Sequence, residues 1–273
     1  MTRSRPRDLP GFDPTVPNEA RMADYYMGGK DNFAADREAA ELALQLAPDL
    51  PMIVLEARKF LGRAVRFLAG TGIRQFVDVG CGLPTQGGVH EVLRPLAPDA
   101  RVAYVDSDPV VVVHARALLD TGDPAVVLQA DARDPDRLLA DPELTGLIDF
   151  DRPVAFLLHS FLVLIPEDDL ATHIVDRFRQ TMAPGSHLLV SHAISDSRPD
   201  VTEKLARLYQ DNDVVKGKPR NNVRTRAEVE RFLDGLEVLP PGMVELPAWR
   251  PDKGEPTVDP ASVWAIGGIG VKR

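Results

Sequence analysis

One pattern recurs between Gln75 and Ala193: a short run of Val, Leu, Ile, Ala or Phe, followed by a segment with apolar residues at helical spacing. The apolar runs lie in "RQFVDVG", "RVAYVDSDP", "AVVLQADARDP", "VAFLLHSFLVLI" and "HLLVSHAI". Strands that are apolar on both faces belong to a parallel sheet that helices cover on both sides. The pattern therefore predicts an α/β fold of the doubly wound type, in which ligands bind at the carboxyl ends of the strands.

The segments on either side of this pattern complete the predicted fold. Residues 1–18 are rich in Pro, Arg and Asp and predict a mobile arm, and residues 19–72 predict three helices that form a lid or extension. Residues 73–273 predict one Rossmann-like domain, which forms a single globular unit with 19–72. The last two apolar runs, "LEVLPPGMVELPAWRP" and "SVWAIGGIGVKR", predict an antiparallel pair at the edge of a mostly parallel, seven-stranded sheet.

Charge and composition narrow the expected partners. A net charge of −9 argues against broad electrostatic binding to nucleic acid or to an anionic membrane. No apolar run approaches the roughly 20 residues that span a bilayer. Cys81 is the single cysteine, so a reducing compartment fits, and the histidines show no metal-binding spacing. We therefore expect a cytoplasmic protein without metal, membrane or nucleic-acid partners; composition does not address its oligomeric state.

A glycine loop, "VGCGLPTQGG", follows the first predicted strand. Gly80 and Gly82 fill the first two positions of the dinucleotide fingerprint G-x-G-x-x-G, but Thr85 stands at the third. No P-loop motif occurs in the sequence. The loop therefore predicts close approach of a ligand to the backbone without an obligatory phosphate, with a tight turn as the alternative. Cys81, between the two glycines, is interpreted as a small packing residue at this loop.

Two acids follow the next two predicted strands. Asp106 ends the second strand, where a carboxylate accepts both hydroxyls of a ribose, and Ser107 lies beside it; the alternative is a helix cap. Asp131 ends the third strand, where it would meet the exocyclic amine of an adenine, and the backbone of Ala132 would meet the ring nitrogens. A helix cap or a salt bridge with Arg133 is the alternative there. Together with the glycine loop, the two acids predict an adenosine site.

The charge around the loop favours one adenosine cofactor. Asp78 precedes the loop by two residues, where it would repel a pyrophosphate, and "GCGLPTQGG" contains no Lys or Arg. Both observations suit S-adenosyl-L-methionine, which carries an ammonium and a sulfonium. A nucleotide-dependent oxidoreductase and a non-catalytic protein that binds S-adenosylmethionine or a nucleoside remain as alternatives.

The methionine end of this cofactor is expected near the fourth strand. His159 and Ser160 lie there, and His159 is a candidate general base, with a hydrogen-bonded core histidine as the alternative. The segment "DYYMGGKDN" is a candidate lid: Tyr25 or Tyr26 would face the sulfonium, and Lys30 or Asn32 would meet the carboxylate. A plain turn between helices is the alternative. Residues 200–226 are expected to form the acceptor side of the pocket.

The sequence also resembles the class I S-adenosylmethionine-dependent methyltransferases. "VDVGCG" is similar to their first motif, Asp106 to their ribose acid and "ADA" to their adenine motif. More narrowly, "GGKDNFAADREAA", "GLPTQGGVHEV", "DSDPVVVVHARALL" and "DFDRPVA" resemble an actinobacterial family of methyltransferases without an assigned substrate. The resemblance implies in-line methyl transfer to an unidentified, small-molecule acceptor. The chain departs from the family pattern at Ala23, Cys81 and Val163, where Tyr, Thr and His are usual.

Overall fold

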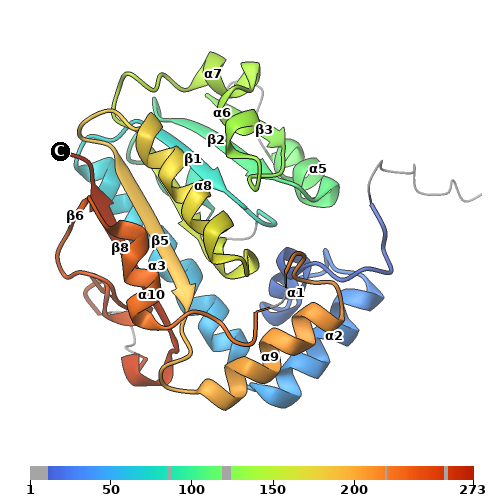
Figure 1. The fold of residues 1–273 in the computed structure, drawn as a ribbon. Helices are drawn as coiled ribbons and strands as arrows, with labels where there is room; N and C mark the ends of the chain where they lie inside the picture. The colour runs from blue at the N-terminus through green and yellow to red at the C-terminus, as the bar shows by residue number, and fades with distance from the viewer. Residues whose placement is uncertain (1–11, 85–87, 119–123, 219, 255–257) are drawn as a thin grey trace, which may run out of the picture.

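The structure is a computed structural model of the 273-residue chain, and it describes residues 12–84, 88–118, 124–218, 220–254 and 258–273. Its centre is one sheet with the strand order β3-β2-β1-β4-β5-β8-β6 (Figure 1). The first five strands are parallel to one another. Their bounds are Gln75–Val79 (β1), Arg101–Asp106 (β2), Ala125–Gln129 (β3), Ala155–His159 (β4) and His187–Ala193 (β5). The predicted doubly wound, mostly parallel fold is confirmed.

The two C-terminal segments pair antiparallel at the edge, as predicted, but the first of them is divided into two short strands. Strand β8, Ala265–Val271, lies antiparallel to β5 inside the sheet, and two short strands pair with its other side. These are β6, Glu237–Val238, and β7, Val244–Glu245, so the sheet has eight strands where the sequence predicted seven. The prolines of "LPPG" separate β6 from β7, because proline has no N–H to donate to a strand ladder.

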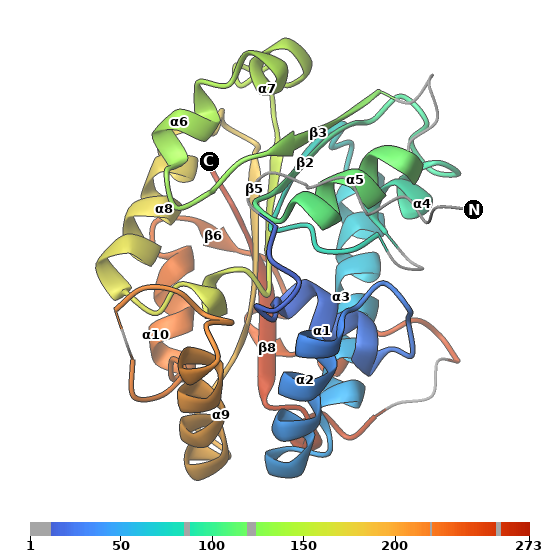
Figure 2. The same ribbon diagram turned by 90° about the vertical axis from the view of Figure 1, so that its right-hand side faces the viewer.

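Helices cover both faces of the sheet (Figure 2). Along each strand alternate side chains enter two separate cores, so Phe76 packs on one side while Val77 packs on the other. The first core also contains residues of α3, α4 and α5, and the second contains residues of α6, α7, α8 and α10. The helices are Glu19–Tyr26 (α1), Ala34–Leu46 (α2), Leu50–Gly70 (α3), Val89–Leu93 (α4), Pro109–Leu118 (α5), Pro135–Leu139 (α6), Pro142–Leu147 (α7), Asp168–Thr181 (α8), Pro199–Asp211 (α9) and Arg226–Glu230 (α10). The 3₁₀-helices are Leu162–Leu164 (η1), Arg231–Leu233 (η2), Leu246–Ala248 (η3) and Pro260–Ser262 (η4).

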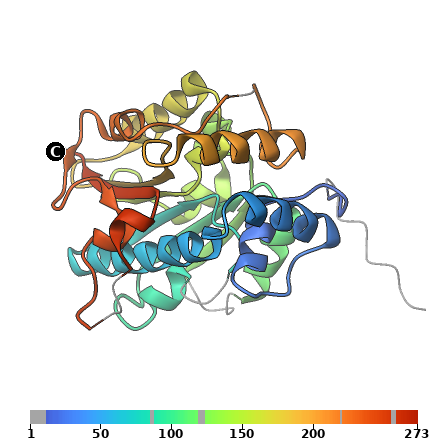
Figure 3. The ribbon, with the colours of Figure 1, turned by 90° about the horizontal axis from the view of Figure 1, so that it is seen from below.

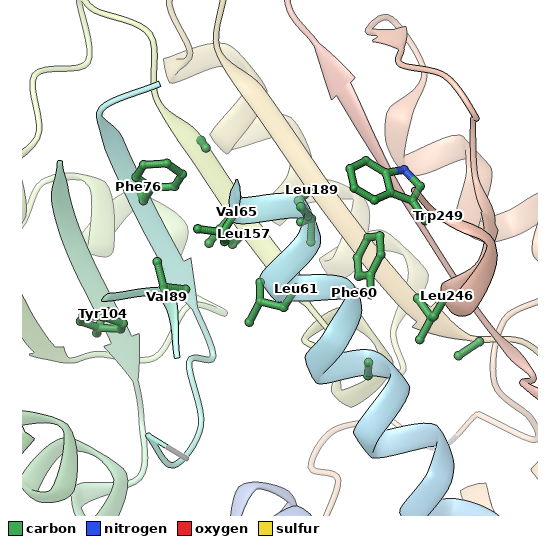
Figure 4. Packing of buried hydrophobic residues seen from close by; sticks show 14 of the residues in the cluster. Phe60, Leu61, Val65, Phe76, Val89, Tyr104, Leu157, Leu189, Leu246 and Trp249 are labelled. Atoms are coloured by element: carbon green, nitrogen blue, oxygen red, sulfur yellow. The ribbon is translucent and has the colours of Figure 1, made fainter. Parts of the chain in front are cut away.

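Helix α3 packs across the sheet and joins it to the C-terminal segment (Figure 4). Phe60 is fully buried, and its ring meets that of Trp249 edge-on at 5.3 Å. A Cβ on Gly267 of β8 would lie 2.5 Å from the Phe60 ring, so glycine at this position lets α3 approach the strand. The buried Arg63 guanidinium donates to the carbonyl oxygens of Trp249 at 2.9 Å and Leu246 at 2.6 Å. These contacts hold α3 in a fixed position over the sheet.

The N-terminal helices lie beyond the carboxyl ends of the parallel strands. Helix α1 packs on α2 and α3, and α2 packs on α9, which Figure 3 shows in orange beside the blue helices. Asn18 caps α1 by accepting from the amide of Ala20 at 2.9 Å. Residues 1–11 of the predicted arm lie outside the described residues; of its remainder, Val16 accepts a hydrogen bond from Arg21. Within the part of the chain that the structure describes, no helix is long and apolar enough to cross a membrane.

Candidate cofactor and acceptor site

A cavity of about 230 Å³ lies where the carboxyl ends of β1, β2, β3 and β4 meet α1 and α3. Nine of the residues predicted for the cofactor line it. They are Gly80, Cys81, Gly82, Asp106, Ser107, Asp131, Ala132, His159 and Ser160. The structure thus brings together in one cavity the residues that the sequence placed at the ends of four separate strands.

The glycine loop needs both of its glycines. Gly80 and Gly82 have φ angles of +67° and +65°, in the left-handed region that glycine adopts without steric cost. A Cβ on Gly80 would also lie 2.8 Å from the Phe161 ring. The amides of Gly80 and Cys81 both donate to the Val105 carbonyl, at 2.8 and 3.1 Å, which ties the loop to β2. Burial raises the pKa of the Cys81 thiol well above its ordinary value, so this side chain is a neutral packing group.

Asp106 is held by backbone amides and still has acceptor capacity. Its Oδ2 accepts from the amide of Gly82 at 3.0 Å and its Oδ1 from that of Asp108 at 2.9 Å. An ionised carboxylate has about four acceptor positions, so two remain for hydroxyls in the cavity. Asp108, and not Asp106, caps the following helix, because it accepts from the amide of Val110 at 2.7 Å. Burial raises the pKa of Asp106 to about 6.

Asp131, which follows the third strand, was interpreted from the sequence either as an adenine contact or as a helix cap or salt-bridge partner of Arg133. The structure shows features of both interpretations. Asp131 lies on the cavity wall and also pairs with Arg133, whose Nη2 is 2.6 Å from its Oδ2. This guanidinium lowers the pKa of Asp131. Ala132 is buried beside them, so its backbone forms part of the wall.

His159 lies at the end of β4 in a hydrogen-bonded chain. Its Nδ1 is 2.9 Å from Ser191 Oγ, which also accepts from the amide of Ser160 at 2.9 Å. Burial, and secondarily the charge of Arg58, lowers the pKa of His159 to about 3. Such an imidazole is neutral and only weakly basic near pH 7, which favours a hydrogen-bonding role over proton abstraction.

Among the cavity residues that were not identified from the sequence, two are charged and lie on the N-terminal helices. Arg58 reaches the glycine loop from α3 and donates to the Leu83 carbonyl at 3.1 Å, so a cation lies beside a loop that itself contains none. Glu19, the first residue of α1, also faces the cavity, and burial raises its pKa to about 7. Neither has a local sequence signal, because each is one charged residue of an ordinary amphipathic helix.

Four other predicted residues lie outside this cavity. Asp78 is buried next to a smaller hollow of about 20 Å³ that shares Arg58 with the main cavity, and burial raises its pKa to about 7. Tyr25 donates to the side chain of Glu41. Lys30 is exposed.

Asn32 belongs to a turn that Asp24 organises. The buried Asp24 carboxylate accepts from the side-chain amide of Asn32 and from the backbone amide of Asp31, both at 2.8 Å. The carboxamide of Asn32 therefore bonds to α1 and does not line the cavity, which matches the alternative of a turn between helices.

Strand order, glycine loop and strand-end acids define an α/β protein with an adenosine-type cofactor site. The S-adenosyl methyltransferase family profile matches residues 7–273 of the chain, which therefore belongs to this family. It is an S-adenosyl-L-methionine-dependent methyltransferase, as the sequence predicted. No curated protein is significantly similar to it.

Two solved structures resemble the chain over nearly its whole length. One, described as a methyltransferase candidate from Thermobifida fusca YX, is 40% identical with a TM-score of 0.88 and covers 98% of this chain and 99% of its own. The other, a DUF574 family protein from Streptomyces avermitilis MA-4680, is 34% identical with a TM-score of 0.88 and covers 96% and 99%. The plantazolicin methyltransferase BamL, 11% identical with a TM-score of 0.51 over 93% of this chain and 96% of its own, shares the fold.

Proposed function

We propose that the cavity at the strand ends binds S-adenosyl-L-methionine and presents its methyl group to a small-molecule acceptor. The observation that carries this assignment is that the ends of four neighbouring strands line one cavity. Adenine would lie beside Asp131 and Ala132, the ribose hydroxyls on Asp106, and the methionine end near Gly80 and Gly82. The cofactor supplies an activated methyl group, and the protein has to hold donor and acceptor in line and exclude water.

The charges of the cavity suit this cofactor better than a dinucleotide. Glu19 and Asp106 face the cavity, and Asp78 lies buried behind the glycine loop. A pyrophosphate beside Glu19 and Asp106 would be repelled by both carboxylates, whereas an ammonium and a sulfonium would be attracted to them. Of the other charged groups in the wall, Asp131 pairs with Arg133, and Arg58 and Lys216 are cations. Arg58 is placed to receive the carboxylate of the methionine end.

Calorimetric titration tests this assignment. We expect S-adenosylmethionine and S-adenosylhomocysteine to bind and NADH not to bind. Arg58→Met should lower the affinity for S-adenosylmethionine at least ~10-fold, because about one charge-assisted hydrogen bond is lost. Arg66→Met is the matched control, because Arg66 extends from the same helix to Asp252 and does not line the cavity. Tighter binding of NADH, or equal effects of the two variants, would contradict the assignment.

The finer points of the assignment concern acceptor, location and source. A small-molecule acceptor is supported by the net charge of −9, which disfavours polyanionic partners. The presence of a single cysteine, which is half-buried, supports a cytoplasmic location. The similarity to proteins of Thermobifida fusca and Streptomyces avermitilis supports an actinobacterial source. Transfer of a radiolabelled methyl group to a fractionated metabolite pool would identify the acceptor.

A further inference from the structure

A second cavity, of about 140 Å³, adjoins the first. The two share part of their walls, since Glu19, Val54, Ala57, Ser160 and Leu164 line both. Residues of helix α9 and of the segment after it line the second cavity, and they belong to the range 200–226 that the sequence analysis expected on the acceptor side. A molecule bound in it would lie next to the methionine end of a cofactor in the first.

The walls of the second cavity are mostly apolar and partly aromatic. Three rings face it, those of Tyr26, Tyr209 and Trp264, and the aliphatic lining includes Leu50, Ile53, Leu205 and Val215. Aromatic walls favour an aromatic guest through offset or edge-on stacking. An apolar cavity of about 150 Å³ holds one benzene molecule, so the space here fits about one substituted ring.

The cations that line this cavity are already neutralised. Arg220 pairs with Glu228 at 2.8 Å and also with Asp168. Arg224 pairs with Asp168 at 3.0 Å and donates to two backbone carbonyls at 2.9 Å each. Burial lowers the pKa of His192 to about 4, so it is neutral near pH 7. An anionic guest would lose its hydration here without meeting a free cation among the described lining residues.

Glu19 lies at the boundary between the two cavities with no hydrogen-bond or ion-pair partner among the described residues. The ionisable groups near it are Arg58 of α3, Asp106 of β2, Tyr26 of its own helix and Tyr209 of α9. Burial raises the pKa of Tyr26 to about 12 and raises the pKa of Tyr209 well above its ordinary value, so both phenols stay protonated. Of these groups, only Glu19 lines both cavities, and its carboxylate can accept a proton near pH 7.

We propose that the second cavity is the acceptor site, that it takes a small neutral aromatic molecule with a phenolic hydroxyl, and that Glu19 accepts the hydroxyl proton. This inference rests on the proposed function. The oxygen–methyl bond forms as the carbon–sulfur bond breaks, the proton passes to the Glu19 carboxylate, and the products are an aryl methyl ether and S-adenosylhomocysteine. A phenol, with a pKa of about 10, is within reach of such a base, whereas an aliphatic alcohol is a far weaker acid.

Binding of a probe tests the site and its ligand class. Calorimetric titrations are made with S-adenosylhomocysteine present. We expect them to show binding of 4-ethylphenol and no binding of 4-ethylbenzoate, its anionic counterpart. Ala206→Trp would fill the second cavity without touching the first and should weaken 4-ethylphenol at least ~10-fold, while S-adenosylmethionine affinity stays within about twofold. Lys204→Trp, on the exposed side of the same helix, is the control. Tighter binding of the benzoate, or equal phenol binding in both variants, would overturn the site.

Proton transfer is tested separately with 4-ethylphenol as acceptor. Glu19→Gln should keep the affinity for the phenol and lower its methylation at least ~100-fold, as expected for loss of a general base. The wild-type rate should fall as the pH drops below about 7, where Glu19 becomes protonated, and the variant should lack this limb. Glu38→Gln, an exposed residue of α2, should match the wild type.

The outcomes separate this inference from the proposed function. If the Glu19→Gln variant methylated the phenol at the wild-type rate, the role of Glu19 would be refuted. If the wild-type protein bound the phenol but did not methylate it, the acceptor assignment would be refuted. If S-adenosylmethionine binds but the phenol does not, the inference fails and the cofactor site stands. If S-adenosylmethionine itself does not bind, the proposed function fails.

Discussion

Removal of the Asp106 carboxylate is the sharpest perturbation of the cofactor site. Its two oxygens are held by the amides of Gly82 and Asp108, at 3.0 and 2.9 Å, and each keeps acceptor capacity toward the cavity. Asp106→Ala deletes the two hydrogen bonds expected to the ribose hydroxyls. Asp106→Asn keeps an oxygen for the Gly82 amide but removes the charge.

The size of the effect follows from the chemistry of these bonds. A hydrogen bond to a charged group contributes about 1.5–3 kcal/mol, so the loss of two costs about 3 kcal/mol even at the low end. Since each 1.4 kcal/mol is tenfold in affinity, Asp106→Ala should raise the dissociation constant of S-adenosylmethionine roughly 100-fold. Asp106→Asn should raise it about 10-fold, because one bond is kept and the other weakened.

Isothermal titration at pH 8 measures these constants with Asp106 ionised in the wild type, because its pKa is about 6. Asp134→Ala is the matched control: Asp134 caps α6 at an exposed position and does not line the cavity, so its affinity should be that of the wild type. Circular dichroism checks that each variant is folded. A folded Asp106→Ala protein with an unchanged dissociation constant would refute the ribose assignment.

Three further expectations concern packing and ionisation, each measured by urea unfolding. Gly267→Ala would place a Cβ 2.5 Å from the Phe60 ring and should lower the free energy of unfolding by about 1–3 kcal/mol. Gly70→Ala is the control, because its Cβ would have no atom within 4 Å, and it should be neutral or stabilising. Equal effects of the two variants would contradict the close approach of α3 to β8. Arg63→Met leaves two carbonyls without their guanidinium donor and should cost about 3 kcal/mol; a change below about 1 kcal/mol would be inconsistent with these bonds. The pKa of His192 is about 4 when folded and 6.5 ordinarily, so its neutral form adds stability above pH 6.5 that is lost as the pH falls. His192→Gln should therefore reduce the stability difference between pH 7 and pH 5 by about 2 kcal/mol, and an unchanged difference would argue against a buried neutral His192.

The ionisation of the cofactor cavity has a common physical cause. Burial raises the pKa of Glu19, Asp78 and Asp106 to between about 6 and 7, and Arg58 offsets part of this for the first two. Carboxylates kept in a low-dielectric cavity favour a ligand that brings positive charge with it.

Much of the fold and half of the site could be predicted because their causes are local in sequence. Strands that are apolar on both faces predicted the parallel sheet. Because parallel strands all end at the same edge of the sheet, the residues that follow each strand were predicted to lie together at that edge. Gly80, Gly82, Asp106 and Ala132 were found in this way. The capping box at Thr225 is another local signal that the structure confirms.

The N-terminal helix shows where such prediction ends. One face of α1 lines the two cavities, with Glu19, Ala20, Ala23 and Tyr26. Tyr25 lies about 100° round the helix from Tyr26 and donates to Glu41 instead. The rotation of α1 is set by its packing on α2 and α3, which no local pattern reports.

The sequence by itself determined the α/β class, the strand ends that line the main cavity and the cofactor's adenosyl character, because hydrophobic period and strand direction act over a few residues. Tertiary structure decided the rest. It inserted β8 between β5 and the edge, brought Arg58 and Glu19 to the loop, and set α9 as the wall of a second cavity. The physical reason is that helix rotation and docking depend on the contacts of side chains far apart in the chain, such as Phe60 against Gly267.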